Sequence, residues 1–257
     1  MGMGLSVCLG ILLSVQQPTG DEPDPAQRPQ RVDAPITAVH TPSGLDDNDV
    51  AQIMIEGEFP NSCYAIGRAT VRARTEDLEQ GIIQFHLEAL KYERPKCLAV
   101  RTPFLKTVDL GILPSGTYQI LQIKDLAKKG VLNIHKAHRD PDDESSTSDD
   151  NTYAPVDAVF VKEDALGFRR LIVLVGSFTN TCMKFAESFP VYRGPNSRVV
   201  EVLPVVTMER DQRCLDQMVP FFHTVEVPDD VPNGRYVIHV RTMNGNSINK
   251  LDTLTME

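Results

Sequence analysis

The sequence predicts an all-β protein built from two tandem antiparallel β-sandwiches. Three observations lead to this prediction: a residue pattern that occurs twice, an alternation of apolar and polar residues with period two, and frequent glycine, proline and asparagine between the apolar runs. The chain has 257 residues, of which 41% are hydrophobic. This length and composition suffice for two small domains, each with its own core.

The repeated pattern concerns unlike residue types at fixed offsets. Residues 57–63 read GEFPNSC and residues 176–182 read GSFTNTC, so Gly, Phe, Asn and Cys keep their spacing. A second cysteine then stands six positions before a Pro-Phe pair in both halves, at Cys97 and at Cys214. A Pro-x-Gly-x-Tyr motif follows in each half. Agreement in both order and spacing indicates two copies of one domain.

The periodicity within each copy is that of strands. Apolar residues alternate with polar ones over residues 83–89 and 236–242, which predicts one buried and one solvated face for each strand. Asn-Gly-Asn at 244–246 predicts a tight turn before a last strand near 248–254, and 131–134 is the corresponding strand of the first copy. Several short strands in about 100 residues are typical of a β-sandwich.

The Gly-x-Tyr motif near the end of each copy resembles the tyrosine corner of immunoglobulin-like sandwiches, in which the phenol bonds a nearby backbone group. This resemblance gives Tyr118 and Tyr236 a structural role. The wider pattern, Asn-x-Cys, Cys, Pro-Phe and Leu-Pro-x-Gly-x-Tyr, is similar to uncharacterised secreted or lipid-anchored bacterial envelope proteins with immunoglobulin-like domains. The chain departs from antibody domains because it has no tryptophan, and Ile120 and Ile238 stand where a cysteine would follow the tyrosines.

Four of the five cysteines lie at equivalent places in the two copies. The natural pairing among the three possible ones is therefore Cys63 with Cys97 and Cys182 with Cys214. Such bridges require an oxidising compartment, so we expect an exported, extracytoplasmic protein of the periplasm or the cell surface.

The remaining segments predict the domain boundaries. Residues 1–17 form a short apolar leader that resembles a secretory signal, and a lipid on Cys8 is the alternative to its removal with the leader. The other predicted segments are a disordered Pro/Asp-rich tether at 18–49, a first domain at 50–138, an acidic flexible linker at 139–152 and a second domain at 153–257.

The net charge of −9 belongs to the two polar segments rather than to the domains. Residues 16–50 and residues 139–150 each carry a net charge of −5. A nucleic-acid partner is disfavoured because phosphate binding needs clustered Lys and Arg. The first domain is mildly basic, and Arg72 and Arg74 share a strand face with Thr70, which suits either an acidic partner or plain exposure to water.

Catalytic and cofactor-binding motifs are missing from the sequence, so we expect a non-enzyme with no cofactor and no metal site. His135-x-x-His138-x-Asp140 has metal-ligand residue types, but its position beside the acidic linker favours a solvated edge. His86 and His239 fall on the polar side of their strands, and no function is needed to explain them.

These observations favour a non-catalytic cell-envelope protein that acts as an accessory or structural subunit through protein–protein contacts. Contact with the membrane would occur through a lipid anchor or a partner. The alternative is a secreted inhibitor or ligand-binding protein that uses sandwich loops such as Glu76–Gly81 and Arg193–Arg198. An unrecognised hydrolase is the third hypothesis. An exposed apolar patch favours docking, and a pocket with convergent titratable groups favours an enzyme.

Overall fold

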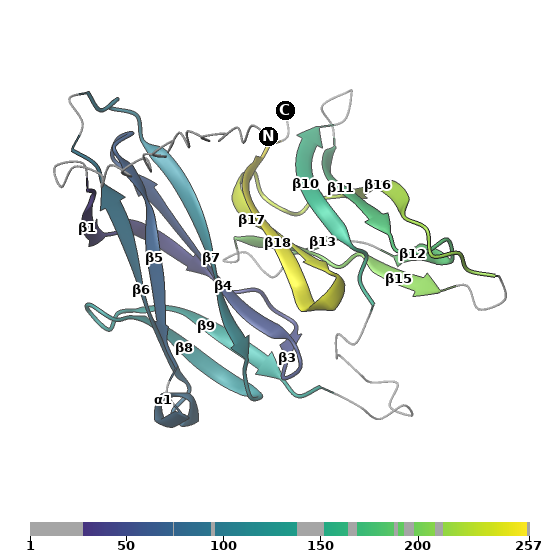
Figure 1. Ribbon diagram of the computed structural model, residues 1–257, viewed down its shortest axis with the longest axis horizontal. Helices are drawn as coiled ribbons and strands as arrows, with labels where there is room; N and C mark the ends of the chain where they lie inside the picture. The colour runs from purple at the N-terminus through teal and green to yellow at the C-terminus, as the bar shows by residue number, and fades with distance from the viewer. Residues whose placement is uncertain are drawn as a thin grey trace, which may run out of the picture.

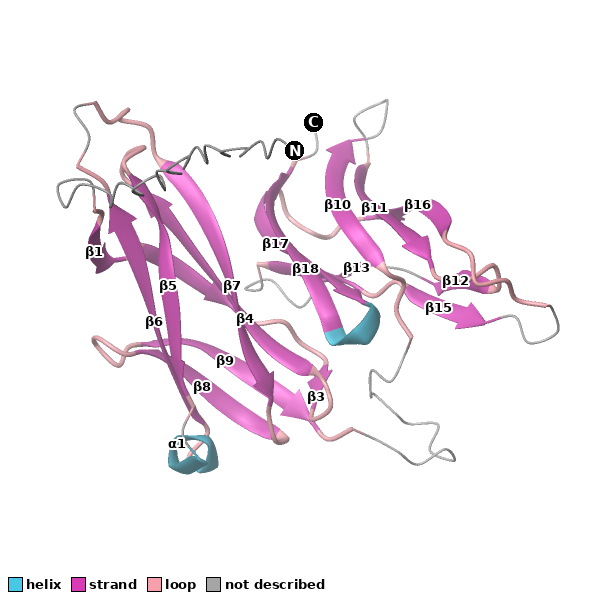
Figure 2. Ribbon diagram, viewed as in Figure 1, coloured by secondary structure: helices cyan, strands magenta, loops and turns pink. Residues whose placement is uncertain are grey.

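The protein consists of two β-sandwiches, which confirms the predicted fold class (Figure 1). The computed structural model describes residues 28–73, 75–93, 96–137, 152–163, 169–187, 190–192, 198–208 and 213–255. Figure 2 shows that strands make up nearly all of the regular structure in this part of the chain. The predicted leader, Cys8 and all but the last residue of the predicted linker lie outside the described residues.

The first sandwich has a larger sheet and a three-stranded sheet. The larger sheet holds β6 at its centre, paired with β5 along one edge and with β1 and β8 along the other, followed by β9 and β3. The three-stranded sheet has the order β2-β4-β7. The bounds are β1 (Gln30–Asp33), β2 (Ile36–His40), β3 (Leu45–Asp46), β4 (Val50–Phe59), β5 (Tyr64–Arg72), α1 (Thr75–Glu79), β6 (Ile82–Lys91), β7 (Thr102–Ile112), β8 (Gly116–Gln122) and β9 (Lys128–His135).

The second sandwich contains a three-stranded sheet of order β10-β11-β16, a four-stranded sheet of order β13-β14-β17-β18, and the pair β12-β15. A 3₁₀ turn, η2, joins β17 to β18 at the predicted Asn-Gly-Asn turn. The bounds are β10 (Val156–Glu163), β11 (Arg170–Phe178), β12 (Met183–Glu187), β13 (Pro190–Tyr192), β14 (Val199–Val202), β15 (Val205–Met208), β16 (Val219–Glu226), β17 (Gly234–Thr242), η2 (Met243–Gly245) and β18 (Asn246–Leu254).

The two sandwiches pair their strands in a similar way. In each three-stranded sheet, the strand that carries the Gly-x-Phe motif lies between two antiparallel neighbours. In the opposite sheet, β6 pairs in parallel with β8, and β14 pairs in parallel with β17. Most pairings are antiparallel as predicted, and these two, together with β3-β9, are the parallel ones among the described strands.

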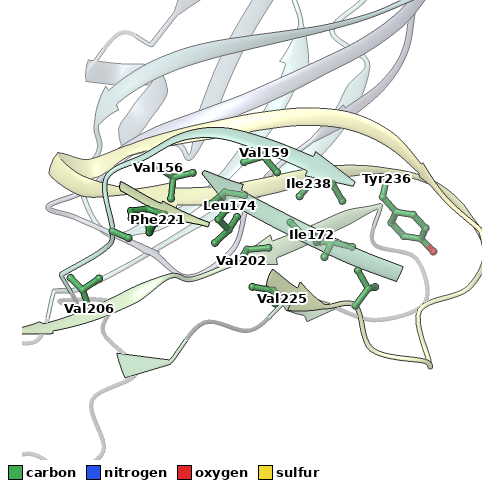
Figure 3. Close-up of a cluster of buried hydrophobic side chains, with 14 of the residues drawn as sticks. Val156, Val159, Ile172, Leu174, Val202, Val206, Phe221, Val225, Tyr236 and Ile238 are labelled. Atoms are coloured by element: carbon green, nitrogen blue, oxygen red, sulfur yellow. The ribbon is translucent and has the colours of Figure 1, made fainter. Parts of the chain in front are cut away.

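The core of each sandwich is formed by the apolar phase of its strands. Ile83, Phe85, Leu87 and Ala89 are all buried in the first sandwich, as the alternation predicts. Burying a Leu, Ile or Phe side chain contributes about 1.5–3 kcal/mol, so these alternating positions fix which face of each strand turns inward. The second core is shown in Figure 3, and its members include Ile172, Leu174, Phe221, Val225, Tyr236 and Ile238.

The prediction of a disordered tether is wrong from residue 30 onward. β1, β2 and β3 lie in this segment and pair with β6, β4 and β9, respectively. Their backbone groups are thus satisfied in the sheets, and Ala34 and Leu45 are buried in the core. The first domain therefore begins near Gln30 instead of at residue 50. Residues 18–27 of the predicted tether lie outside the described part.

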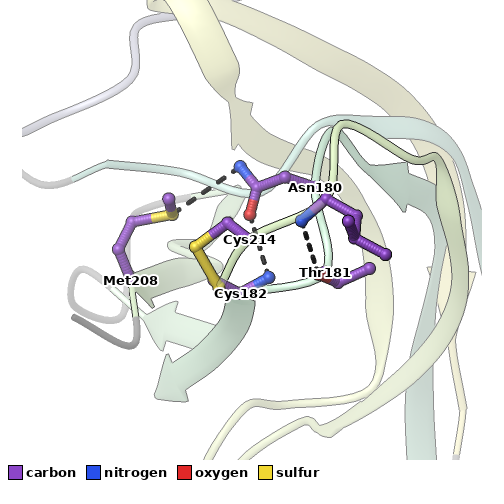
Figure 4. The surroundings of a disulfide bond; sticks show 6 residues. Asn180, Thr181, Cys182, Met208 and Cys214 are labelled. Carbon is purple, nitrogen blue, oxygen red and sulfur yellow. Dashed lines mark hydrogen bonds between the residues drawn. A yellow bond between two sulfur atoms is a disulfide. The ribbon is translucent and has the colours of Figure 1, made fainter. Parts of the chain in front are cut away.

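Both predicted disulfides are present, Cys63–Cys97 and Cys182–Cys214. The structure also explains the asparagine two positions before each first cysteine. The Asn180 side-chain oxygen accepts a hydrogen bond from the Cys182 backbone N–H at 3.0 Å (Figure 4), and Asn61 does the same for Cys63 at 2.9 Å. In each sandwich this hydrogen bond closes a turn that orients the backbone at the first cysteine of the disulfide.

The motif tyrosines are buried at the ends of the two cores. The Tyr118 hydroxyl donates a hydrogen bond to the Pro114 carbonyl at 2.7 Å, and burial raises the pKa of this phenol. The ring of Tyr236 lies 5.5 Å from the guanidinium carbon of Arg198. The first tyrosine thus ties the start of β8 to the preceding turn.

The motif glycines let a phenylalanine lie directly over the strand. A Cβ atom on Gly57 would stand 2.1 Å from Cζ of Phe104 and 2.3 Å from the Pro35 carbonyl oxygen. The same contacts occur in the second sandwich, where a Cβ on Gly176 would stand 2.2 Å from the Pro155 oxygen. One of the two clashing groups is backbone in each case, so a side-chain shift cannot relieve the contact.

Gly57→Ala is therefore expected to lower the free energy of unfolding by about 1–3 kcal/mol, the usual cost of overpacking. Gly116→Ala is the matched control, because the nearest atoms to its added Cβ are 3.8 Å away. Urea unfolding of the two variants measures the difference. Equal stabilities would show that the close contact at Gly57 does not constrain the fold.

Candidate functional site

β17 is buried on both faces, which sets it apart from an ordinary sandwich strand. Tyr236, Ile238 and Val240 point into the core of the second sandwich. The alternate residues lie on the opposite face and are covered by the first sandwich, so His239 is only 2% exposed. The expectation that the polar phase of this strand is solvated is therefore wrong at His239.

A network of side-chain hydrogen bonds joins the two sandwiches. The Ser247 hydroxyl on β18 donates to the side-chain oxygen of Gln52 on β4 at 2.5 Å. The Asn249 amide donates to the same oxygen and to the Thr107 hydroxyl, both at 3.2 Å. Beside this network, Met54 packs against Val199 and Val237 in a small apolar cluster. The outer face of β4-β7 and the outer face of β14-β17-β18 thus form one interface.

Charged groups are buried in the same interface. The Arg241 guanidinium lies 3.2 Å from the Asp49 carboxylate and donates to the Ser43 carbonyl at 3.2 Å. Burial lowers the pKa of Arg241, and the nearby carboxylates of Asp49 and Asp46 oppose that shift. On β14, Glu201 accepts hydrogen bonds from the Ser43 backbone N–H at 2.7 Å and from the Ser43 hydroxyl. The segment around Ser43 in the first sandwich therefore binds two buried groups of the second sandwich, the Arg241 guanidinium and the Glu201 carboxylate.

His239 is held as a neutral ring. The Asn249 amide nitrogen already donates to Gln52 and Thr107, so its oxygen faces Nδ1 of His239, 2.6 Å away, and accepts from it. This arrangement places the ring proton on Nδ1. Burial is the main cause that lowers the pKa of His239, against the opposing effects of Asn249 and Glu201. The ring acts as a hydrogen-bonding spacer and carries no charge near neutral pH.

A cavity of about 560 Å³ opens at the end of this interface, between η2 and the segment that precedes β4. Arg241 and Asp49 line it, but they are paired with each other across the interface. The Tyr153 hydroxyl and Nε2 of His239 also belong to residues that line the cavity, yet both atoms are enclosed by protein and have almost no accessible surface. The titratable groups here hold the two sandwiches together and do not converge on open space.

The second notable feature is an exposed apolar sheet face, which we call the β11 face: Ala158, Phe160, Leu171, Val173, Val175, Phe222 and Thr224. Phe160 lies opposite Val173 on one side of β11, and Phe222 lies opposite Val175 on the other. Phe222 is 79% exposed and Phe160 is 53% exposed. Paired residues on neighbouring strands lie about 5 Å apart, so these side chains form one continuous patch.

The other sequence candidates do not come together in a site. His135 is exposed at the end of β9, while His138, Asp140 and Arg74 lie outside the described residues. Within the part of the chain that the structure describes, His, Cys, Asp and Glu form no group that could hold a metal ion. The loop Glu76–Gly81 forms most of α1 and the turn after it, and all but the last residue of Arg193–Arg198 lies outside the described part.

Comparison with known proteins supports the fold class and does not identify the whole chain. Residues 53–129 match the family model described as the ORF11 beta-sandwich domain. This match runs from β4 to the start of β9, so it concerns the first sandwich, and it covers less than half of the chain. No curated protein and no solved structure matches the chain.

The interface predicts that the two sandwiches stay together when the chain between them is cut. A protease site placed within residues 139–151 is expected to yield two fragments that co-elute in size-exclusion chromatography. Arg241→Ala is expected to separate them, because removal of one partner from a buried ion pair costs about 3–5 kcal/mol. Arg101→Ala is the control, since its pair with Glu58 is exposed and contributes about 0–1 kcal/mol. Separation of the unmutated fragments would contradict this interface.

His239 makes stability depend on pH. The unfolded chain binds a proton at this residue as the pH falls below the ordinary value of 6.5, whereas the folded chain resists it. The contribution of His239 to the free energy of unfolding is therefore complete above pH 6.5. It is lost as the pH falls, by at most about 1.4 kcal/mol per pH unit.

We expect His239→Gln to flatten the dependence of the unfolding free energy on pH between about 6.5 and 5. His223→Gln should have a smaller effect in the same direction, because burial also lowers the pKa of His223 but this residue is only partly buried. Denaturant unfolding across this pH range is the measurement. An unchanged slope in His239→Gln would show that the ring is protonated equally in both states.

Proposed function

We propose that the chain is a non-catalytic, exported cell-envelope protein that serves as an accessory or structural subunit through protein–protein contacts. The β11 face carries this proposal. Soluble proteins rarely expose a continuous apolar patch with two large aromatic side chains unless another surface covers it. The phenylalanines stand on strands that are hydrogen-bonded in a sheet, so the backbone that carries them does not have to be ordered on binding.

Two further observations agree with this proposal. The disulfides indicate an oxidising environment, which an exported protein meets. The repeated Asn-x-Cys, Pro-Phe and Gly-x-Tyr pattern resembles secreted or lipid-anchored bacterial proteins with immunoglobulin-like domains, and such sandwiches commonly act by docking. Separately, no helix in the described residues is long and apolar enough to cross a membrane.

The enzyme hypothesis has less support from the geometry. The titratable residues Asp49, His239 and Arg241 line the cavity between the sandwiches, but each is already bonded within the protein: Arg241 to Asp49 across the interface, and His239 to Asn249. A catalytic base needs to reach a substrate proton within hydrogen-bonding distance, and an enclosed nitrogen such as Nε2 of His239 does not. The hypotheses of a loop-based inhibitor and of a lipid on Cys8 stay predictions.

Site-specific photo-crosslinking in the native cell tests the docking proposal. A photoreactive residue in place of Phe222 is expected to form a discrete covalent adduct with a protein on irradiation. The same residue in place of Val131, which is exposed on the outer face of β9, is the control and should form none. Equal adducts at both positions, or none at either, would contradict docking through the β11 face.

A further inference from the structure

The β11 face is the counterpart of a surface that is already covered in the first sandwich. β4 lies between β2 and β7 as β11 lies between β10 and β16, and Gly57 and Gly176 mark the same place in the two strands. The outer face of β4 packs on the outer face of β14-β17-β18 through Gln52, Met54 and Glu56. In this chain, then, the outer face of such a three-stranded sheet serves to pack against another sheet.

The chemistry of the two faces differs at equivalent positions. Counting back from the motif glycines, Glu56, Met54 and Gln52 correspond to Val175, Val173 and Leu171. Glu56 pairs with Arg235 at 3.4 Å, and Gln52 receives two hydrogen bonds from β18, so the face of β4 needs a polar partner. The β11 face has apolar residues at all three places and needs an apolar partner.

The outer face of the larger sheet of the first sandwich does not supply that partner. Gln84 and His86 on β6, with Gln119 and Asn133 on β8 and β9, give that face a polar character, and His86 is bonded to Asp33 at 2.9 Å. A head-to-tail array, in which the β11 face of one copy covers this sheet in the next, would bury these groups against phenylalanine without hydrogen bonds. Such burial costs roughly 1–3 kcal/mol for each polar group.

We infer that the β11 face binds the β11 face of a second copy of this chain, with a two-fold axis between them. This inference rests on the docking function proposed above and names the partner. Among the described sheet faces, the β11 face itself has the matching chemistry, and two identical patches that face each other form a closed dimer. The rim carries both signs of charge, with Lys162 and Glu163 on β10 and the exposed Arg169–Glu226 pair beside β11.

The size of the face sets the strength that we expect. Strands of eight or nine residues are about 25–30 Å long, and three of them span about 10–15 Å. These dimensions give about 250–450 Å² for each copy and about 500–900 Å² for the pair, which is below the size of a standard specific interface, so the dimer should be weak and dissociate on dilution. The closed symmetry predicts a single step from monomer to dimer with no larger species.

Sedimentation of the purified full-length chain over a dilution series tests the inference. We expect the mass to rise with concentration toward twice that of one chain. Phe222→Asp is expected to weaken the dimer at least tenfold and to leave the fold intact, because the Phe222 side chain lies outside the core and is 79% exposed. Val131→Asp is the matched control and should leave the dimer unchanged. A wild-type chain that stays monomeric, or a dimer that survives Phe222→Asp, would overturn the inference.

A single cysteine distinguishes face-to-face pairing from a head-to-tail contact. Thr224 lies on the β11 face opposite Val173. Thr224→Cys is expected to form a covalent dimer on mild oxidation, because a bond between identical positions requires that the two faces meet. Addition of Phe222→Asp should abolish it. If Phe222 forms an adduct with another protein in cells while the pure chain is monomeric, the docking function stands and its partner is not a second copy.

Discussion

The arrangement of the molecule depends on the burial of β17 between two surfaces. One face of this strand completes the core of the second sandwich, and the other carries Val237, His239 and Arg241 into contact with the first. A buried guanidinium is tolerated only where carboxylates and carbonyls surround it, and the segment from Ser43 to Asp49 supplies both. The strands and loops near the start of the chain therefore have two structural roles: they pair within the sheets of the first sandwich, and they bind the second sandwich.

This interface gains its specificity from polar groups and much less from apolar area. Each hydrogen bond fixes a register: Asn249 meets Gln52 and Thr107 together only when β18 lies across β4 and β7 in one position. Met54 and its two valine neighbours add apolar contact but would tolerate sliding. Removal of one polar partner leaves the others buried without bonds, so the network either forms completely or is costly. The hydrogen-bond network thus fixes the relative orientation of two domains that have separate cores.

The sequence could predict features that depend on local residue patterns, such as strands and disulfides. It could not predict burial that results from contact with another domain. The residue pattern that occurs twice predicted two sandwiches, and the equivalent cysteines predicted the two bridges. The strands before residue 50 were missed because Pro and Asp dominate the average composition there, although Ala34-Pro35 and Ala154-Pro155 repeat at the starts of the two domains. The exposure of His239 was predicted wrongly for a different reason. Alternation shows that a side chain points away from the core of its own domain, but it does not show what covers the other face of the strand.

The same limit of local patterns explains why the β11 face stands out only in the structure. Val173 and Val175 alternate with buried Ile172 and Leu174, so β11 reads as a continuous apolar run, the pattern of a strand that is covered on both faces. β17, which is covered on both faces, nevertheless carries His and Arg on its outer side, because its partner surface is polar and within the same chain. β11 is apolar on both sides and, within the part of the chain that the structure describes, is covered on one. The sequence of β11 is the one expected for a strand whose outer face also contacts an apolar surface. The described part of a single chain does not provide that surface.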